Sequence, residues 1–344
     1  MIRRHMIMSA AFATLALASC SGGDDDDATA TPTPTGTPTP TPTASPTYTA
    51  FPLTTATEFS TINATTSYTG DPATSAVTLG VAGTESMSTR VRLATSNAID
   101  TAEYVLRENT EESRFKKANL TTAPAPTTPE FVFRINDATT AGKFSQVEFL
   151  NNTIPPATTG GAAVITNDTG LQFTQLSYAN WWRGDSTAGA KRIAYTVFGY
   201  PTVLTDMPCQ TAGQCNASTP VQAYNARVNG RLISVTGATT AITRVGGTAA
   251  VSVNFATGLV TVTLTLTTTD GTTTTPYGTF TAQGAIGVGN NQFTGSFRSG
   301  SPLDGTIAGG FFGSQAKEVG ITFAGSGTFN GAQQRLVGQV VGKK

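Results

Sequence analysis

The 344-residue chain contains a single histidine, at position 5. Residues 1–19 read as an export signal, with Arg3 and Arg4 before a mostly apolar segment, so the mature chain keeps no histidine. This excludes Ser-His-Asp and Cys-His hydrolysis, and histidine-ligated metals, unless a partner supplies the residue. A hydrolase that uses two carboxylates stays open by residue type, but no motif singles out such a pair. We predict no metal, no cofactor and no enzymatic activity.

Cysteine is scarce as well, with three residues. Cys20 ends the sequence Leu17-Ala18-Ser19-Cys20, which has the form of a lipobox, so we expect Cys20 to be acylated and to begin the mature chain. An ordinary secretory signal with an incidental cysteine is the alternative. Cys209 and Cys215 flank Gly213, and so close a pair in an exported chain favours a loop-closing disulfide over a redox or metal site.

Charged residues make up only 12% of the chain, and their signs balance. Loss of residues 1–19 removes Arg3 and Arg4 and no acid, which leaves 19 basic against 21 acidic residues. Such a balance provides no basic field for nucleic acid or for anionic lipid. We therefore predict no nucleic-acid partner.

Large apolar residues are missing from the segment that follows Cys20. Four aspartates, Asp24 to Asp27, precede a Thr-Pro run from Thr29 to about Thr49, with no large apolar residue before Tyr48. Such a run cannot bury a core, and its prolines favour an extended polyproline geometry of about 3.1 Å per residue. We predict a disordered stalk over residues 20–49 that reaches up to about 90 Å from the bilayer.

Threonine, glycine, serine, valine and alanine dominate the rest, which is typical of an all-β protein. We place an N-terminal β-rich domain at residues 50–200 and a β-barrel domain at residues 201–344. Residues 98–117 are expected to be helical or irregular and solvated. Six strands are expected in the first domain, at Val77–Gly80, Thr89–Ala94, Glu130–Asn136, Gln146–Leu150, Leu171–Ser177 and Arg192–Phe198.

Eight further strand candidates follow in even succession after residue 220, separated by turn sequences such as Asp270-Gly271 and Asn330-Gly331. Eight antiparallel strands close a barrel just wide enough to fill with side chains. A transmembrane barrel is the competing architecture, but the candidate strands are short and their outward positions mostly polar. The eight are Ala223–Asn229, Ala249–Phe255, Leu259–Thr267, Tyr277–Ala285, Gln292–Arg298, Gly305–Phe312, Val319–Ala324 and Leu336–Val341.

The stretch from Gly309 to Phe323 contains an apolar strand, a short connection and a returning strand. We expect Ser314 to cap a single helical turn in that connection. The motif G-G-F-F-G-x-x-A-x-E-x-G resembles the C-terminal barrel signature of the transferrin-binding protein B lobes and of the factor H binding lipoproteins. It departs from the signature of the transferrin-binding lobes at Val319. The segment from Val197 to Gly230 resembles the passage from handle to barrel in the transferrin-binding lobes.

The resemblance implies a C-terminal eight-stranded antiparallel β-barrel packed on a smaller, handle-like N-terminal β domain. It also implies a non-enzymatic surface lipoprotein that binds a protein or nutrient ligand, with an outer-membrane transporter as a candidate partner. Ser21 after Cys20 favours sorting to the outer membrane under the same resemblance. A structural or adhesive envelope lipoprotein is the alternative function.

The ligand is expected on the loops and the N-terminal sheet, because bulky residues such as Phe293 and Phe311 suffice to fill the barrel. Trp181 and Trp182 are the only ligand-binding candidates that we single out, as an exposed aromatic pair. Burial of at least one of them in the core is the alternative.

Overall fold

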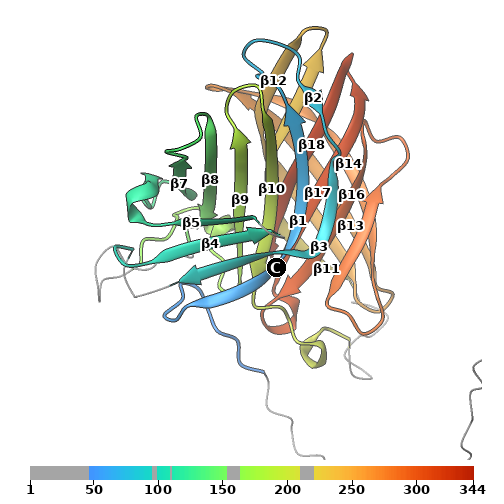
Figure 1. Cartoon of the computed structure of the whole chain (residues 1–344). Coiled ribbons are helices and arrows are strands. Elements are labelled where there is room, and N and C mark those ends of the chain that lie inside the picture. Colours follow the sequence, from blue (N-terminus) through green and yellow to red (C-terminus); the bar gives the residue numbers. More distant parts are fainter. Residues whose placement is uncertain (1–45, 95–98, 109–110, 153–162, 210–220) are drawn as a thin grey trace, which may run out of the picture. The chain divides into compact units, whose positions relative to one another are not determined.

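The N-terminal part of the chain forms one antiparallel sheet, and the C-terminal part forms a closed barrel (Figure 1). The computed structural model describes residues 46–344 apart from 95–98, 109–110, 153–162 and 210–220, and residues 45–344 form one unit. The predicted signal, Cys20, most of the stalk and Cys215 lie outside the described residues. No helix in the described ranges is long and apolar enough to cross a membrane.

The sheet runs in the order β5-β4-β3-β1-β10-β9-β8-β7-β6, and β2 pairs with β1. Its centre joins segments far apart in sequence, because β1 lies beside β10, with Ile62 opposite Val197. The strands are β1 (Thr57–Thr69), β2 (Thr78–Leu79), β3 (Gly83–Ala94), β4 (Glu103–Glu108), β5 (Glu111–Phe115), β6 (Leu120–Thr122), β7 (Glu130–Asn136), β8 (Lys143–Leu150), β9 (Leu176–Asp185) and β10 (Ala190–Gly199).

The prediction of a helical or irregular segment at residues 98–117 was wrong, because β4 and β5 lie there, although most of its charged side chains are exposed, as expected. Tyr104 and Leu106 alternate with their neighbours and are completely buried, as is Phe115. The charged residues around the turn between the two strands concealed this period of two. β1 was also missed, since threonine, asparagine and alanine separate its buried Phe59, Ile62 and Tyr68 and no apolar alternation is visible.

The eight predicted barrel strands are all present, and the ring closes where β11 pairs with β18. Most of the strands are longer than predicted, and β11 and β12 have 16 residues each. They are β11 (Val221–Thr236), β12 (Thr239–Asn254), β13 (Leu259–Asp270), β14 (Thr273–Ile286), β15 (Gln292–Phe297), β16 (Asp304–Phe312), β17 (Glu318–Phe329) and β18 (Ala332–Lys343).

Side chains fill the interior of the barrel. Phe280, Phe311 and Phe323 are fully buried in one cluster with apolar residues from all the barrel strands. The Phe311 ring centroid lies 5.0 Å from that of Phe255 and 5.5 Å from that of Phe293. The lumen therefore is a packed core.

The sheet packs against one side of the barrel. Phe312 and Val341 of the barrel meet Ile62 and Val197 of the sheet in one buried cluster. Phe311 and Phe312 are thus both buried, one inside the barrel and the other between barrel and sheet. Gly320 permits this approach, because a β-carbon there would lie 2.9 Å from the Leu176 side chain.

The connection between β16 and β17 contains the 3-10 turn η4 (Ser314–Ala316), so the expected helical turn is present. Ser314 does not cap it: Gly313 occupies the cap position, with a φ of 70°. Glu318 follows and turns its carboxylate onto the backbone before β9. Its oxygens accept hydrogen bonds from the amides of Thr174 (2.7 Å), Gln175 (2.9 Å) and Leu176 (2.7 Å).

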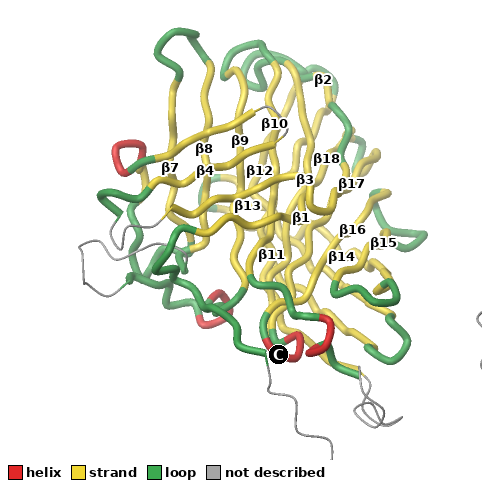
Figure 2. The backbone as a smooth tube through the Cα atoms, turned by 60° about the horizontal axis from the view of Figure 1, so that its bottom comes forward, coloured by secondary structure: helices red, strands yellow, loops and turns green. Residues whose placement is uncertain are grey.

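The folded unit has two ends, which we name by the path of the chain. At the entry end, the Tyr48 hydroxyl donates to Asp206 Oδ2 (2.9 Å), so Tyr48, predicted to lie in the stalk, belongs to the folded unit. Figure 2 turns this end toward the viewer, with the C-terminus beside short helical turns. Two of these turns are η3 (Leu204–Asp206) and η4. The other 3-10 turns of the described residues are η1 (Lys117–Asn119) and η2 (Thr169–Leu171). The distal end holds the β1–β2, β9–β10 and β11–β12 connections (Figure 1).

Candidate functional site

Strand β9 places Trp181 and Trp182 on opposite faces of the sheet. Trp181 is 1% exposed, packs in the aromatic cluster on the face away from the barrel and donates from Nε1 to Ser145 Oγ (2.7 Å). The Arg183 guanidinium covers its ring at 3.7 Å. Trp181 is therefore a core residue and has no surface to offer a ligand.

Trp182 faces the barrel side and lines a cavity of about 410 Å³ near the distal end. The Phe144 ring stands edge-on to it, with centroids 5.7 Å apart. Arg134 stacks on Phe144 at 4.4 Å, and Arg231 of the barrel lies 4.9 Å from the Trp182 ring. Tyr68 forms a further wall, and burial raises the pKa of its hydroxyl to about 12, so it stays neutral. The cavity thus combines an aromatic wall with two cationic side chains, Arg134 and Lys191, and one carboxylate, Asp71.

Lys191 holds the loops at the mouth of this cavity. Its Nζ donates to the carbonyls of Gly70 (2.7 Å), Thr187 (2.5 Å) and Gly189 (2.9 Å). Burial lowers the pKa of this ammonium group. One side chain thereby joins the β1–β2 and β9–β10 loops, which keeps the aromatic wall in place without a ligand.

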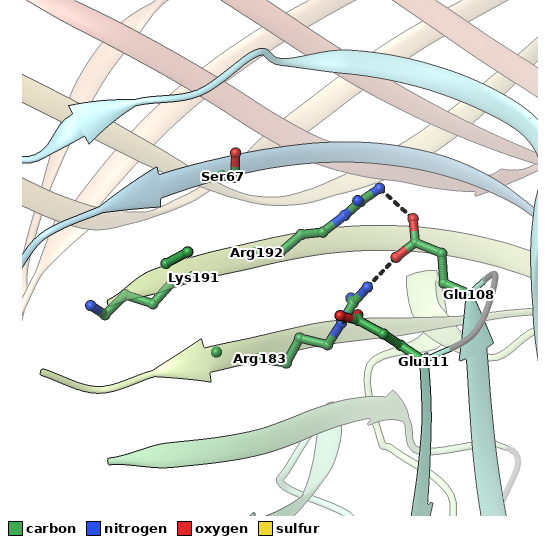
Figure 3. Close-up of a pocket in the computed structure, with 8 residues that line it drawn as sticks. Ser67, Glu108, Glu111, Arg183, Lys191 and Arg192 are labelled. Carbon is green, nitrogen blue, oxygen red and sulfur yellow. Dashed lines mark hydrogen bonds and ion pairs between the residues drawn. The ribbon is translucent and has the colours of Figure 1, made fainter. Parts of the chain in front are cut away.

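A second cavity, of about 370 Å³, lies where the β4–β5 hairpin meets the sheet. Figure 3 shows the carboxylate of Glu108 between Arg183 and Arg192, with each arginine paired to one of its oxygens. Arg183 also reaches Glu111 at 2.5 Å. These acids and bases neutralise one another, and they hold the hairpin over the aromatic core beneath it.

A buried polar cluster around Glu130 lies between the sheet and the barrel. Glu130 Oε1 accepts hydrogen bonds from the Tyr178 hydroxyl (2.9 Å), from Asn180 Nδ2 (3.4 Å) and from Asn229 of the barrel. Burial, together with the nearby charge of Glu148, raises the pKa of Glu130 to about 7. This carboxyl therefore changes its charge near neutral pH.

Glu148 joins sheet to barrel beside it. Its Oε1 accepts from Arg231 Nη2 (3.2 Å) and from Arg244 Nη2 (3.3 Å), both on barrel strands. The side chain of Glu148 is only 4% exposed and that of Arg231 11%, so this contact is shielded from solvent. Such a shielded pair depends on both partners, because loss of either would leave a buried charge.

The remaining predicted site residues are outside this geometry. Cys209 is described and Cys215 is not, so the disulfide stays a prediction, as does acylation of Cys20. Within the described ranges, no three His, Cys, Asp or Glu side chains come together in a way that could hold a metal ion.

Sequence reasoning found Trp182 but missed Tyr68, Arg134 and Phe144. These residues come from β1, β7 and β8, and the sheet order alone brings them to one cavity. No local signal existed for Phe144, since it shares a face of β8 with Gln146 and Glu148, whereas Val147 and Phe149 alternate on the other face. Because the residues that line the cavity lie far apart in the sequence, no local pattern indicated that they come together.

Residues 211–344 match the family model described as the C-lobe and N-lobe beta barrels of Tf-binding protein B. Similar solved structures include intact Ap-TbpB with N and C lobes, at 11% identity over 84% of this chain and 78% of that chain, with a TM-score of 0.36. Transferrin Binding Protein B from Haemophilus parasuis Hp5 gives 11% over 86% and 77%, with a TM-score of 0.32. That of serogroup B Neisseria meningitidis gives 12% over 84% and 77%, with a TM-score of 0.31. No curated protein matches the chain.

The family match and the closed ring of strands cover the same part of the chain. The signature from Gly309 to Gly320 lies inside it, and the structure gives that signature a physical basis: Phe311 fills the lumen, Gly313 permits the turn and Glu318 joins barrel to sheet. Residues 211–344 therefore resemble the β-barrels of transferrin-binding protein B, and within this range residues 221–343 form the closed ring.

Proposed function

We propose that this protein is a non-enzymatic surface lipoprotein that binds a protein ligand at the distal end of its N-terminal sheet. An acylated Cys20 anchors it to the outer membrane, and the Thr-Pro stalk carries the folded unit. The family whose barrel it shares is named for binding transferrin, a protein, which supports a protein ligand here without identifying it. An outer-membrane transporter is the candidate partner for onward transfer.

The observation that carries this proposal is the cavity walled by Tyr68, Phe144 and Trp182. Aromatic rings beside a cationic group are the composition of interface hot spots, because they bury much area at a small cost in conformational entropy. The barrel lumen is filled with side chains, which leaves this cavity as the better place for a partner to insert a side chain. Its location beside loops fits the same role.

The test is capture from outer-membrane extract and growth medium by the full mature chain and its variants. Trp182→Ala should weaken capture of the ligand by tenfold or more, the loss typical of an interface hot spot of about 2 kcal/mol. Val288→Ala is the matched control, because it removes an exposed apolar side chain at the entry end. Equal capture by Trp182→Ala and wild type, with both folded by circular dichroism, would contradict the proposed site.

The anchor has its own test, independent of the ligand. Cys20→Ala removes the thiol that would carry the acyl chains, so the exported variant should leave the membrane fraction. A variant that still partitions with membranes would show that the chain is held in another way. Ligand capture by the released variant should be unchanged.

A further inference from the structure

Exposed large apolar side chains gather at the entry end of the barrel. Over the described ranges, seven such residues are exposed, and five of them lie at this end. Val288 is the extreme case, with its side chain fully in solvent. The five are Val203, Leu204, Val221, Leu259 and Val288.

The strand register shows that these positions share one rim. Val221 and Leu259 both pair with Asn254, so they stand in one row on the outside of the barrel. Val288 lies in the β14–β15 connection, which reaches η3 through a hydrogen bond from Asn291 Nδ2 to the Thr202 carbonyl (2.6 Å). The distal turns of the described barrel expose no large apolar residue. Random scatter of surface apolar residues would not separate the two rims in this way.

The exposed charge at this rim is mainly positive. Lys317 is exposed, and Lys343 and Lys344, at the end of β18, lie beside it, with the Lys344 amide bonded to the Lys317 carbonyl (3.2 Å). The ammonium groups of Lys343 and Lys344 already donate to backbone carbonyls (2.9 and 2.5 Å), and burial lowers the pKa of Lys344 to about 8. The nearby acids Asp206 and Glu318 are buried and already accept hydrogen bonds. For the chain as a whole, the balance of acidic and basic residues argues against binding to anionic lipid. At this rim, however, the exposed charge is not balanced.

The chain enters the folded unit at the same rim. Tyr48 is held there by Asp206, and the Val203 amide donates to the Tyr48 hydroxyl (3.0 Å). A membrane anchor at Cys20 is therefore connected to the folded unit at this rim, through the intervening stalk. A tether raises the effective concentration of the rim at the bilayer to about the millimolar range, so a weak affinity for the surface is sufficient.

We infer that the entry rim of the barrel contacts the surface of the membrane that carries the anchor. The five apolar side chains enter the headgroup region, and the exposed Lys317 faces lipid phosphates, a combination typical of interfacial membrane binding. This inference rests on the proposed anchoring at Cys20. It orients the cavity at Trp182 away from the bilayer, toward the space from which a ligand arrives.

The test couples the mature chain, from Cys20 to Lys344, through the Cys20 thiol to a maleimide lipid in vesicles of phosphatidylethanolamine and phosphatidylglycerol with brominated acyl chains. Cys209→Ser and Cys215→Ser are present throughout, so that one thiol reacts. Val288→Trp reports on the entry rim and Val81→Trp on a position in the distal half that is also largely exposed. Bromine should quench the added fluorescence of Val288→Trp severalfold more than that of Val81→Trp.

Two further changes test the cause of the contact. Leu204→Ser with Leu259→Ser in the Val288→Trp background should abolish the difference in quenching, whereas Val81→Ser should leave it. Equal quenching of the two reporters, no quenching of Val288→Trp, or dimers formed through this rim would overturn the inference. Because the thiol coupling replaces biological acylation, these outcomes are independent of the Cys20→Ala result.

Discussion

Glu318 should contribute more to stability than its place in a turn suggests. Its carboxylate is 2% exposed and accepts three backbone hydrogen bonds from Thr174, Gln175 and Leu176, and a fourth from the Thr174 hydroxyl (3.0 Å). No other side chain in this contact offers an acceptor of the same charge and reach. Removal of the carboxylate would leave three amides between barrel and sheet without partners.

The expected magnitude follows from those unpaired groups. Each buried amide left without a partner costs about 1–3 kcal/mol, and water that enters the space left by the side chain recovers part of that cost. Glu318→Ala should therefore lower the free energy of unfolding by about 3–5 kcal/mol. Glu318→Gln should lower it by about 2–4 kcal/mol, because its amide nitrogen would face amide donors on one side.

The assay is urea unfolding, read from the midpoint at an unchanged slope, together with hydrogen exchange at residues 174–176. Glu85→Gln is the control, because this exposed glutamate should cost no more than about 0.5 kcal/mol. The reasoning is refuted if Glu318→Gln unfolds at the wild-type midpoint and the amides of residues 174–176 stay protected. In that case the carboxylate would not be their essential acceptor.

Three further predictions concern two buried phenylalanines, the Glu130 carboxyl and the disulfide. Phe311→Ala and Phe312→Ala should each cost about 3–5 kcal/mol, since one ring fills the lumen and the other the interface; a small loss at Phe312 would mean that the sheet packs loosely. The folded-state pKa of Glu130 is raised from 4.5 to about 7, so its stabilising effect is complete below about pH 4.5 and is lost as the pH rises through 7. Wild type should therefore lose up to about 3 kcal/mol relative to Glu130→Gln between pH 5 and 8 in paired urea titrations, and parallel curves would contradict this. Non-reducing peptide mapping should join Cys209 to Cys215, a short loop worth about 2 kcal/mol, whereas two free thiols would disprove the disulfide.

The barrel was predictable because its signals are local. Alternation of apolar and polar residues at Val251 and Val253, and turn pairs such as Asp270-Gly271, are complete within a few residues. Consecutive strands then pair in order, so eight hairpin-connected strands lead to a ring without further information. The strand ends were less visible, because threonine and glycine extend β11 and β12 beyond their apolar centres.

The N-terminal sheet was less predictable, because its centre pairs β1 with β10, elements separated by more than a hundred residues. Charged residues around Glu108 and Glu111 indicated a solvated surface, yet Glu108 is buried because Arg183 and Arg192 neutralise it. The partners that make such a charge tolerable in the interior are not its neighbours in sequence. Composition therefore predicted the exposure of Glu108 incorrectly, although Arg107, Glu111 and Arg114 of the same hairpin are exposed.

The sequence by itself determined the all-β class and the eight-stranded barrel, because each depends on residue type or on a short periodic pattern. Only the tertiary structure decided that Trp181 is core while Trp182 lines a cavity with Tyr68 and Phe144. Likewise, only the tertiary structure brings the amides of residues 174–176 to Glu318 and places the exposed apolar residues together at the entry rim. The physical reason is the same in each case: these contacts join distant segments, and the side-chain burial that decides them depends on which strands pack together.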